Sequence, residues 1–101
     1  MSLFGALSAS LTSLTAQSNQ VNVISNNIAN LDTTGFKATT VSFETLVTGS
    51  TGGGVIDSNR NDLDEQGAIE STGVETDLAI QGSGFFTVED LSENLLYTRS
   101  G

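Results

Sequence analysis

The first 31 residues of the chain contain no charged side chain, and this feature constrains the fold more than any other. Apolar residues recur in this stretch at spacings of three and four in two runs, Phe4, Leu7, Leu11, Leu14 and then Val21, Ile24, Ile28, Leu31, with the polar Ser18 and Ser25 making the stripe imperfect toward its middle. The spacing predicts a helix over residues 2–31 with a narrow apolar stripe of the coiled-coil type. At 1.5 Å per residue, such a helix is about 45 Å long.

The predicted helix needs a partner for its stripe, yet no second helical pattern of that length follows. Only 37% of the 101 residues are apolar, which is a thin core for an independent domain. Two interpretations stay open: a loosely stable monomer, or a chain that buries the stripe against copies of itself or against a segment outside it. We favour the second, and expect subunit packing through Leu7, Leu11, Leu14, Val21, Ile24 and Ile28.

The predicted helix ends in a block rich in residues that favour turns and caps. Asn30, Asp32 and Gly35 lie there, and Gly35 is expected to adopt a positive φ. Residues 32–54 form a predicted linker. Within it, residues 36–47 are ambiguous between a strand and a short helical turn, and the glycine-rich residues 48–54 are expected to form a flexible loop.

From residue 55 onward the pattern indicates short β-strands, at 55–56, 68–72, 78–80, 85–88 and 95–98. Residues 78–80 and 85–88 flank a glycine-rich turn and therefore predict a hairpin. A β core is expected from Leu78, Ile80, Phe85 and Phe86. The predicted fold class is α+β, with a long N-terminal coiled-coil-type helix (1–31), an extended linker (32–54) and an incomplete β-rich segment (55–101). A strand signal so close to the last residue suggests a truncated domain.

Composition and charge argue against several functions. The formal charge is −9, with three basic residues against twelve acidic ones, which disfavours binding to nucleic acid or to an anionic membrane surface. No His or Cys occurs, so imidazole catalysis, disulfides and the usual zinc sites are excluded. No signal-peptide or membrane-spanning pattern is present, since no basic residue precedes Lys37 and polar residues interrupt the apolar ones.

Two further sequence motifs that could indicate ligand binding do not match the full patterns of such sites. Gly82-Ser83-Gly84 is not followed by a lysine or a helical pattern, so it does not match a phosphate-binding loop. The acidic residues from Asp57 to Glu65 do not match the 12-residue calcium loop, because Asp62 occupies position 6, where that loop requires glycine. We expect no enzymatic activity, no cofactor and no metal.

Four blocks together resemble the bacterial flagellar rod and hook axial proteins, and most of all the hook members of that family. They are Ser25–Lys37, Gln66–Thr72, Asp77–Phe86 and Tyr97–Gly101. The resemblance marks a joint formed by Asn26, Asn27, Asn30, Asp32, Gly35, Phe36 and Lys37.

The resemblance implies a structural subunit that polymerises helically. In this family the N-terminal helix pairs with a C-terminal helix in the inner tube, and the joint connects it to an outer β-rich domain. The implied partners are copies of the chain, the rod, the hook cap and the hook–filament junction. Export through the flagellar type III apparatus, without a cleaved signal, implies an extracellular location, where the hook transmits motor torque as a universal joint. The alternatives are a rod subunit, or a soluble, non-flagellar binding module with a helical arm.

Overall fold

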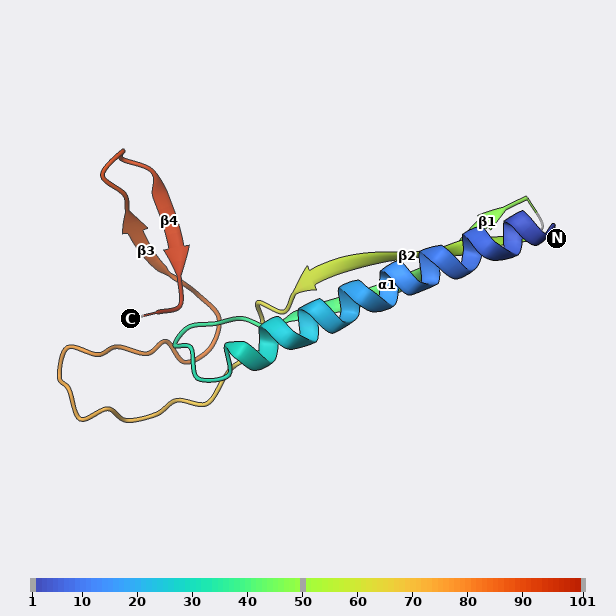
Figure 1. Cartoon of the computed structure of the whole chain (residues 1–101). Helices are drawn as coiled ribbons and strands as arrows, with labels where there is room; N and C mark the ends of the chain where they lie inside the picture. Colours follow the sequence, from blue (N-terminus) through green and yellow to red (C-terminus); the bar gives the residue numbers. More distant parts are fainter. Residues whose placement is uncertain (1, 50, 101) are drawn as a thin grey trace.

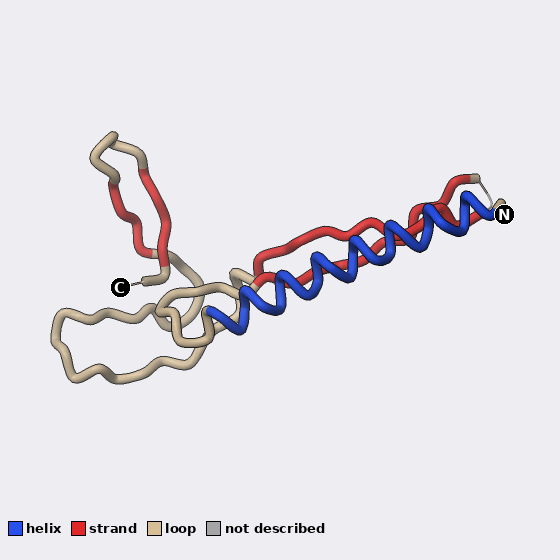
Figure 2. The backbone as a smooth tube through the Cα atoms, in the orientation of Figure 1, coloured by secondary structure: helices blue, strands red, loops and turns tan. Residues whose placement is uncertain are grey.

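The computed structural model describes residues 2–49 and 51–100, which form one long helix and two antiparallel hairpins (Figure 1). The elements are α1 (Leu3–Ala29), β1 (Thr39–Thr48), β2 (Thr51–Asn61), β3 (Phe86–Glu89) and β4 (Leu95–Thr98). The β1–β2 hairpin runs alongside α1, while the β3–β4 hairpin lies beyond the C-terminal end of the helix (Figure 2). The predicted α+β class is confirmed.

Helix α1 begins and ends within two residues of the predicted bounds. The hydroxyl of Ser2 caps its start by accepting a hydrogen bond from the backbone N–H of Gly5 at 3.1 Å. At the other end, the backbone N–H of Asn30 donates to the carbonyls of Asn26 and Asn27 at 3.2 and 3.3 Å. Gly35 then adopts a φ of 74°, which confirms the positive-φ turn expected from the sequence.

The side of α1 that faces the β1–β2 hairpin carries mainly small and polar residues. Ala16 on this side is 1% exposed and is the one buried apolar side chain among the described residues. The Thr12 hydroxyl accepts a hydrogen bond from the backbone N–H of Val55 at 3.2 Å. Gly54 passes so close that a Cβ there would collide with this hydroxyl. The prediction that the helix has no partner within the chain is therefore wrong for this side.

The glycine-rich stretch from 48 to 54 is not the predicted loop, because most of it belongs to β1 and β2. Thr45 pairs with Val55 and Leu46 with Gly54, and the register then shifts so that Val47 pairs with Gly52. The shift leaves one extra residue on β2, as in a β-bulge. The ambiguous segment 36–47 forms β1 from Thr39 onward. The hairpin thus crosses the border predicted between residues 54 and 55.

The second hairpin differs from the predicted one. Residues 68–72 and 78–80 are irregular rather than extended strands, and β3 pairs with β4, with Phe86 opposite Thr98. The strand predicted at 95–98 is confirmed. Gly82 and Gly84 do adopt positive φ angles of 97° and 138°, but their turn precedes β3 and does not join two strands.

The molecule is elongated and exposes an unusually large surface. Its radius of gyration is 19.9 Å, whereas a compact domain of this length has about 13 Å. Its accessible area is 8022 Å², against about 5,400 Å² for a compact monomer of the same mass. The described residues therefore leave exposed a large area that a globular domain would bury. None of the helices in the described part of the chain has the length and apolar character needed to span a membrane.

Candidate functional site

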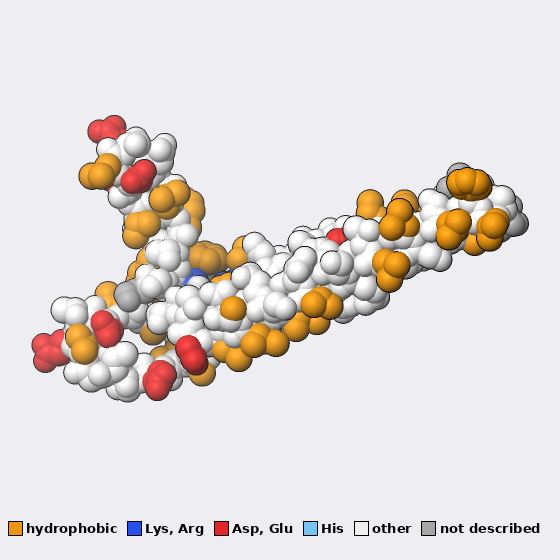
Figure 3. Space-filling model, in the orientation of Figure 1, with side chains coloured by type: hydrophobic (Ala, Val, Ile, Leu, Met, Phe, Trp, Pro, Cys, Tyr) orange, Lys and Arg blue, Asp and Glu red, His pale blue; other side chains and the backbone are white. Residues whose placement is uncertain are grey.

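The apolar stripe of α1 is defined by Leu7, Leu11, Leu14, Val21, Ile24 and Ile28. Most of it lies away from the β1–β2 hairpin, and Leu11 lies at the edge that borders the strands. Its six side chains are between 48% and 68% exposed. Leu3, Phe4 and Leu31 extend the exposed apolar surface beyond both ends of the stripe. The space-filling view shows hydrophobic side chains along the edge of the rod-like part (Figure 3). An apolar surface of this length, on an uncharged helix, is typical of a protein-binding surface.

The stripe continues onto the hairpin through an open groove between α1 and the strands. Leu11 lies on its helical side, and Leu46 and Ile56 lie on its hairpin side. Leu46 and Ile56 are themselves 41% and 50% exposed. The helix and the hairpin therefore present a joint apolar surface, which the sequence pattern of the helix alone does not predict.

Asn27 ties the end of α1 to the start of β1. Its Nδ2 donates to the carbonyl of Thr39 at 2.8 Å, and its Oδ1 accepts from the backbone N–H of Thr39 at 3.1 Å. The side-chain amide thus satisfies both backbone groups of Thr39, as a neighbouring strand would. This pair of bonds fixes where the hairpin begins relative to the helix.

The other predicted joint residues lie in the turn that follows. Asn30 Nδ2 donates to the carbonyl of Asn26 at 2.8 Å, and Asn30 Oδ1 accepts from the Thr33 hydroxyl at 3.0 Å. Asp32 is exposed, whereas Phe36 and Lys37 are half-buried. These contacts shape the turn locally after the helix ends.

Two contacts connect this turn to distant parts of the chain. Lys37 Nζ donates to the carbonyl of Glu65. The Cα of Gly35 packs against the backbone after β4, where a Cβ would lie 2.6 Å from the nitrogen of Ser100 and 2.9 Å from the carbonyl carbon of Arg99. Only glycine fits at this close approach.

Beside Gly35 lies the Arg99 cluster, which we define as Gln66, Gly82, Gly84, Phe85 and Arg99. Arg99 Nη1 donates to the carbonyls of Gly82 and Gly84 at 3.0 and 2.7 Å, and its Nη2 donates to Gln66 Oε1 at 2.9 Å. Gln66 Oε1 also accepts from the backbone N–H of Gly82 at 3.1 Å. The guanidinium lies 5.9 Å from the centre of the Phe85 ring.

Gly35 and the Arg99 cluster bring together the four motif blocks, which are far apart in the sequence. The first block contributes Gly35, the second Gln66, the third Gly82 to Phe85, and the fourth Arg99. Neither Arg99 nor Gln66 was among the residues predicted for the site. One signal existed: Arg99 is one of three basic residues in the chain and lies within the fourth block.

The residues predicted to form a β core are not buried within the described chain. Leu78 and Phe85 are 64% and 40% exposed, and Ile80 and Phe86 are half-buried. Phe85 contacts the Arg99 guanidinium and lies just before β3.

The described residues also bring no three His, Cys, Asp or Glu side chains together in a way that would hold a metal ion. The site therefore consists of an apolar surface and a joint held together by hydrogen bonds and close backbone packing.

Comparison with known proteins gives consistent matches. Residues 6–37 match the profile of a family described as "Flagella basal body rod protein". The flagellar hook protein FlgE of Brucella abortus is 37% identical over 106 residues, which cover 100% of this chain and 27% of that protein. The hook protein FlgE of Caulobacter vibrioides is 38% identical, over 97% of this chain and 18% of that protein. The flagellar basal-body rod protein FlgG of Buchnera aphidicola is 37% identical, over 91% and 43%. The chain thus spans about a quarter of the Brucella hook protein.

Proposed function

Because the chain belongs to the flagellar rod and hook family, whose N-terminal part it matches, we propose that it is a structural component of the axial part of the bacterial flagellum. Its role is to polymerise helically, and the hook is the structure we favour. There it would act as a universal joint that transmits motor torque to the filament. The chemistry of the site supports a binding role without catalysis or cofactor.

The observation that carries this proposal is the contrast between two sides of α1. One side is closed by the hairpin through small residues such as Ala16, while the apolar stripe on another side has no partner among the described residues. Exposure of six large apolar side chains along one helix is costly for a monomer in water, since each gains roughly 1.5–3 kcal/mol on full burial. The chain also exposes roughly 2,600 Å² more than a compact monomer of the same mass, which leaves area available for contacts with neighbouring copies.

The distribution of charge supports the burial of helix α1 in the wall of the tube. Helix α1 carries no charged side chain, and all twelve acidic residues lie between Asp32 and Glu93. A helix without charges suits a crowded tube wall, because burying an unpaired charge is costly. We propose that residues 1–31 face the inner tube with the β1–β2 hairpin packed on α1, that the turn after the helix contains the joint, and that the residues beyond β2 lead to an outer domain.

The remaining features of the proposal follow from family membership. The partners are copies of the same protein, together with rod, hook-cap and hook–filament junction proteins. The location is the extracellular flagellum, reached through the flagellar type III apparatus without a cleaved signal. Neither nucleic-acid binding nor membrane insertion is part of the proposed role.

A rod subunit is the second candidate, and two matches favour it. The matching family profile carries the description of a rod protein, and the Buchnera rod protein is 37% identical to this chain, as is the Brucella hook protein. An experiment in cells distinguishes the two roles. The protein, as its gene encodes it, should restore hooks to a strain lacking the hook gene. Restoration of a strain lacking a rod gene instead would establish the second candidate.

Assembly of purified variants tests the proposal. We expect Leu14→Ala and Ile28→Asn to raise the critical concentration for polymerisation by about 30-fold or more, because removing a buried leucine side chain costs about 2–5 kcal/mol. The matched control is Asn22→Ala, an exposed change on the same helix outside the stripe, which should assemble normally. Electron microscopy and sedimentation give the readout.

Two results would contradict the proposal. One is that Leu14→Ala and Ile28→Asn form the same tubes as the parent protein. The other is that the parent stays monomeric at high concentration and binds a specific ligand, which would favour the soluble binding module.

A further inference from the structure

We propose that Arg99 is a latch that fixes the orientation of the β3–β4 hairpin relative to the rod formed by α1 and the β1–β2 hairpin. This role concerns the folded chain itself and does not depend on the proposed flagellar function. It rests on how few contacts link the two parts, and on which residues make them.

The two parts of the molecule do not touch through their regular elements. Among the described residues, no Cα of β3 or β4 lies within 8 Å of a Cα in α1, β1 or β2. Figure 1 shows the same separation, with the β3–β4 hairpin projecting from the loops at the end of the helix. Their relative orientation is therefore determined by the connecting loops and by the contacts at the joint.

Arg99 occupies the centre of those contacts. Its side chain reaches from the end of β4 to three oxygen acceptors on two other segments, namely the carbonyls of Gly82 and Gly84 and the side chain of Gln66. Gln66 lies next to Glu65, whose carbonyl accepts from Lys37 just after the helix turn. The path from β4 to the rod thus runs through Arg99, Gln66 and the Lys37 contact.

The backbone around these contacts is built to receive an arginine. Gly82 and Gly84 have φ angles of 97° and 138°, which residues with a Cβ rarely adopt, and their carbonyls converge on the same nitrogen, Nη1. The planar guanidinium donates from two nitrogens in fixed directions, whereas a lysine ammonium is a single point on a flexible stem. A lysine at position 99 would therefore keep the charge but lose the fixed geometry.

The backbone that carries Arg99 is held on its other side by the helix turn. Gly35 leaves no room for a Cβ beside the backbone of Arg99 and Ser100. With the side chain bound to Gln66 and the glycine loop, the end of β4 is clamped between the turn after α1 and residues 82–84. Release of the side chain would leave the packing against Gly35 and the bond from the Gly82 N–H to Gln66 Oε1 to hold the β3–β4 hairpin in place.

Distance measurement between two spin labels tests the latch directly. The chain has no native cysteine, so Gln17→Cys on α1 and Ser92→Cys between β3 and β4 place labels at two exposed sites. In the parent chain we expect a single narrow distance distribution. In Arg99→Ala and in Arg99→Lys we expect the distribution to become at least twice as wide, while the helical circular-dichroism signal of α1 stays unchanged.

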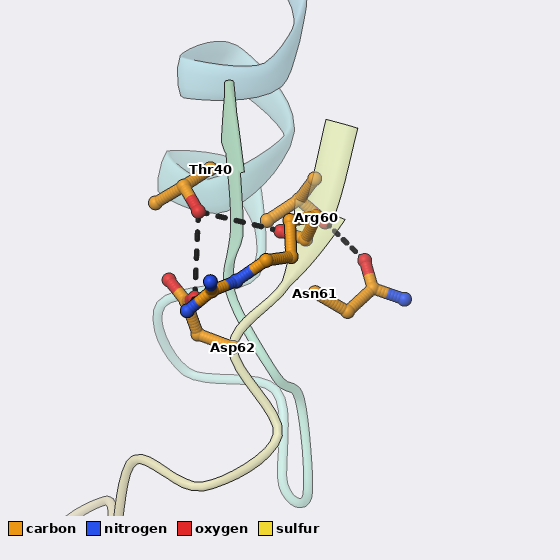
Figure 4. Close-up of polar contacts among 5 residues, drawn as sticks. Thr40, Arg60, Asn61 and Asp62 are labelled. Carbon is orange, nitrogen blue, oxygen red and sulfur yellow. Dashed lines mark hydrogen bonds and ion pairs between the residues drawn. The ribbon is translucent and has the colours of Figure 1, made fainter. Parts of the chain in front are cut away.

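Arg60→Ala is the matched control. The Arg60 side chain is 80% exposed on β2 and pairs with Asp62 at 3.7 Å. The Thr40 hydroxyl donates to the backbone carbonyl of Arg60 and to Asp62 Oδ1 (Figure 4). Its removal should leave the distribution narrow. A second variant, Gln66→Ala, removes the oxygen shared by Arg99 and Gly82 and should widen the distribution as Arg99→Ala does.

The proposal is overturned by any of three results. The first is a narrow distribution in Arg99→Ala or Gln66→Ala. The second is equal widening in Arg60→Ala. The third is loss of the helical signal in Arg99→Ala, because Arg99 would then support α1 itself and not the orientation of the hairpin.

Discussion

Replacement of Gly35 by alanine should destabilise the joint, and the structure allows the free-energy cost to be divided into backbone strain and a steric clash. The φ of 74° places residue 35 in the left-handed region, where a Cβ costs roughly 1–2 kcal/mol. The new Cβ would also lie 2.6 Å from the nitrogen of Ser100, inside the 3.4 Å of ordinary contact. The obstacle is backbone, so no rotamer change relieves it, and overpacking of this kind adds about 1–3 kcal/mol. The expected total is about 2–5 kcal/mol.

Gly49→Ala separates the two contributions. Gly49 has a similar φ of 69°, but no atom lies within 4 Å of the position of its Cβ. This variant should therefore show the backbone strain alone, about 1–2 kcal/mol, within its own hairpin. Any larger effect of Gly35→Ala then reports the close approach to Ser100.

Hydrogen exchange followed by mass spectrometry measures both effects locally. Peptides covering residues 30–38 contain the Phe36 N–H, which donates to the carbonyl of Thr33. In Gly35→Ala we expect their exchange to accelerate by about 30-fold or more, since each 1.4 kcal/mol is a factor of ten. In Gly49→Ala these peptides should be unchanged. The reasoning is refuted if Gly35→Ala leaves residues 30–38 as protected as in the parent, or costs no more than Gly49→Ala.

Three further predictions concern the rod and its assembly. Ala16→Leu should detach the β1–β2 hairpin from α1, because Ala16 is 1% exposed and has no space beside it for three more carbons. The expected cost is about 1–3 kcal/mol of stability, seen as faster hydrogen exchange in β2. Ser18→Leu, on the exposed side of the helix, should leave exchange in β2 unchanged. Asn27→Ala removes both bonds to Thr39 and should destabilise the start of β1 by about 1–3 kcal/mol; unaltered exchange of residues 38–42 would argue against this role. Each chain carries a charge of −9 while its apolar stripe carries none, so salt should screen the repulsion between chains and lower the critical concentration for polymerisation. Sedimentation measures this concentration, and a rise with salt would contradict the prediction.

The helix was predictable because its signal is local and repeated. Spacings of three and four from Phe4 to Leu31 determine α1 to within two residues, and the same pattern correctly identifies the stripe that the hairpin leaves uncovered. Gly35 was also predictable, since a turn after a long helix commonly requires a residue that tolerates positive φ.

The partner of the helix within the chain was not predictable in the same way. Ala9, Thr12 and Ala16 look like neutral surface residues in a periodicity analysis, because their role is to let another backbone approach closely. The approaching residues, Gly54 and Val55, are about forty positions away. Gly54 reads as part of a flexible loop by composition, and the strand predicted at 55–56 gives no sign of the element that it approaches. Small residues carry little hydrophobic signal, so the side of the helix that they form is invisible to hydrophobic patterning.

Part of the prediction of the strands after residue 67 was wrong for a related reason. Gly82 and Gly84 lie in the turn that the sequence indicates, with positive φ, but the predicted hairpin was placed across them. Their carbonyls instead bind Arg99, at sequence separations of 17 and 15 residues, and this long-range contact has no local signature. The true hairpin turns at residues 90–94, where Glu93 adopts a φ of 61° without a glycine to mark it.

Helical reconstruction of the assembled polymer by electron cryo-microscopy tests most directly whether α1 has two sides with different partners. We predict that the β1–β2 hairpin stays on the side of Ala16 and Thr12 within each subunit, and that the stripe from Leu7 to Ile28 is buried in helix–helix contacts of the tube wall. A polymer in which the stripe faces solvent, or a purified protein that forms no polymer, would contradict this.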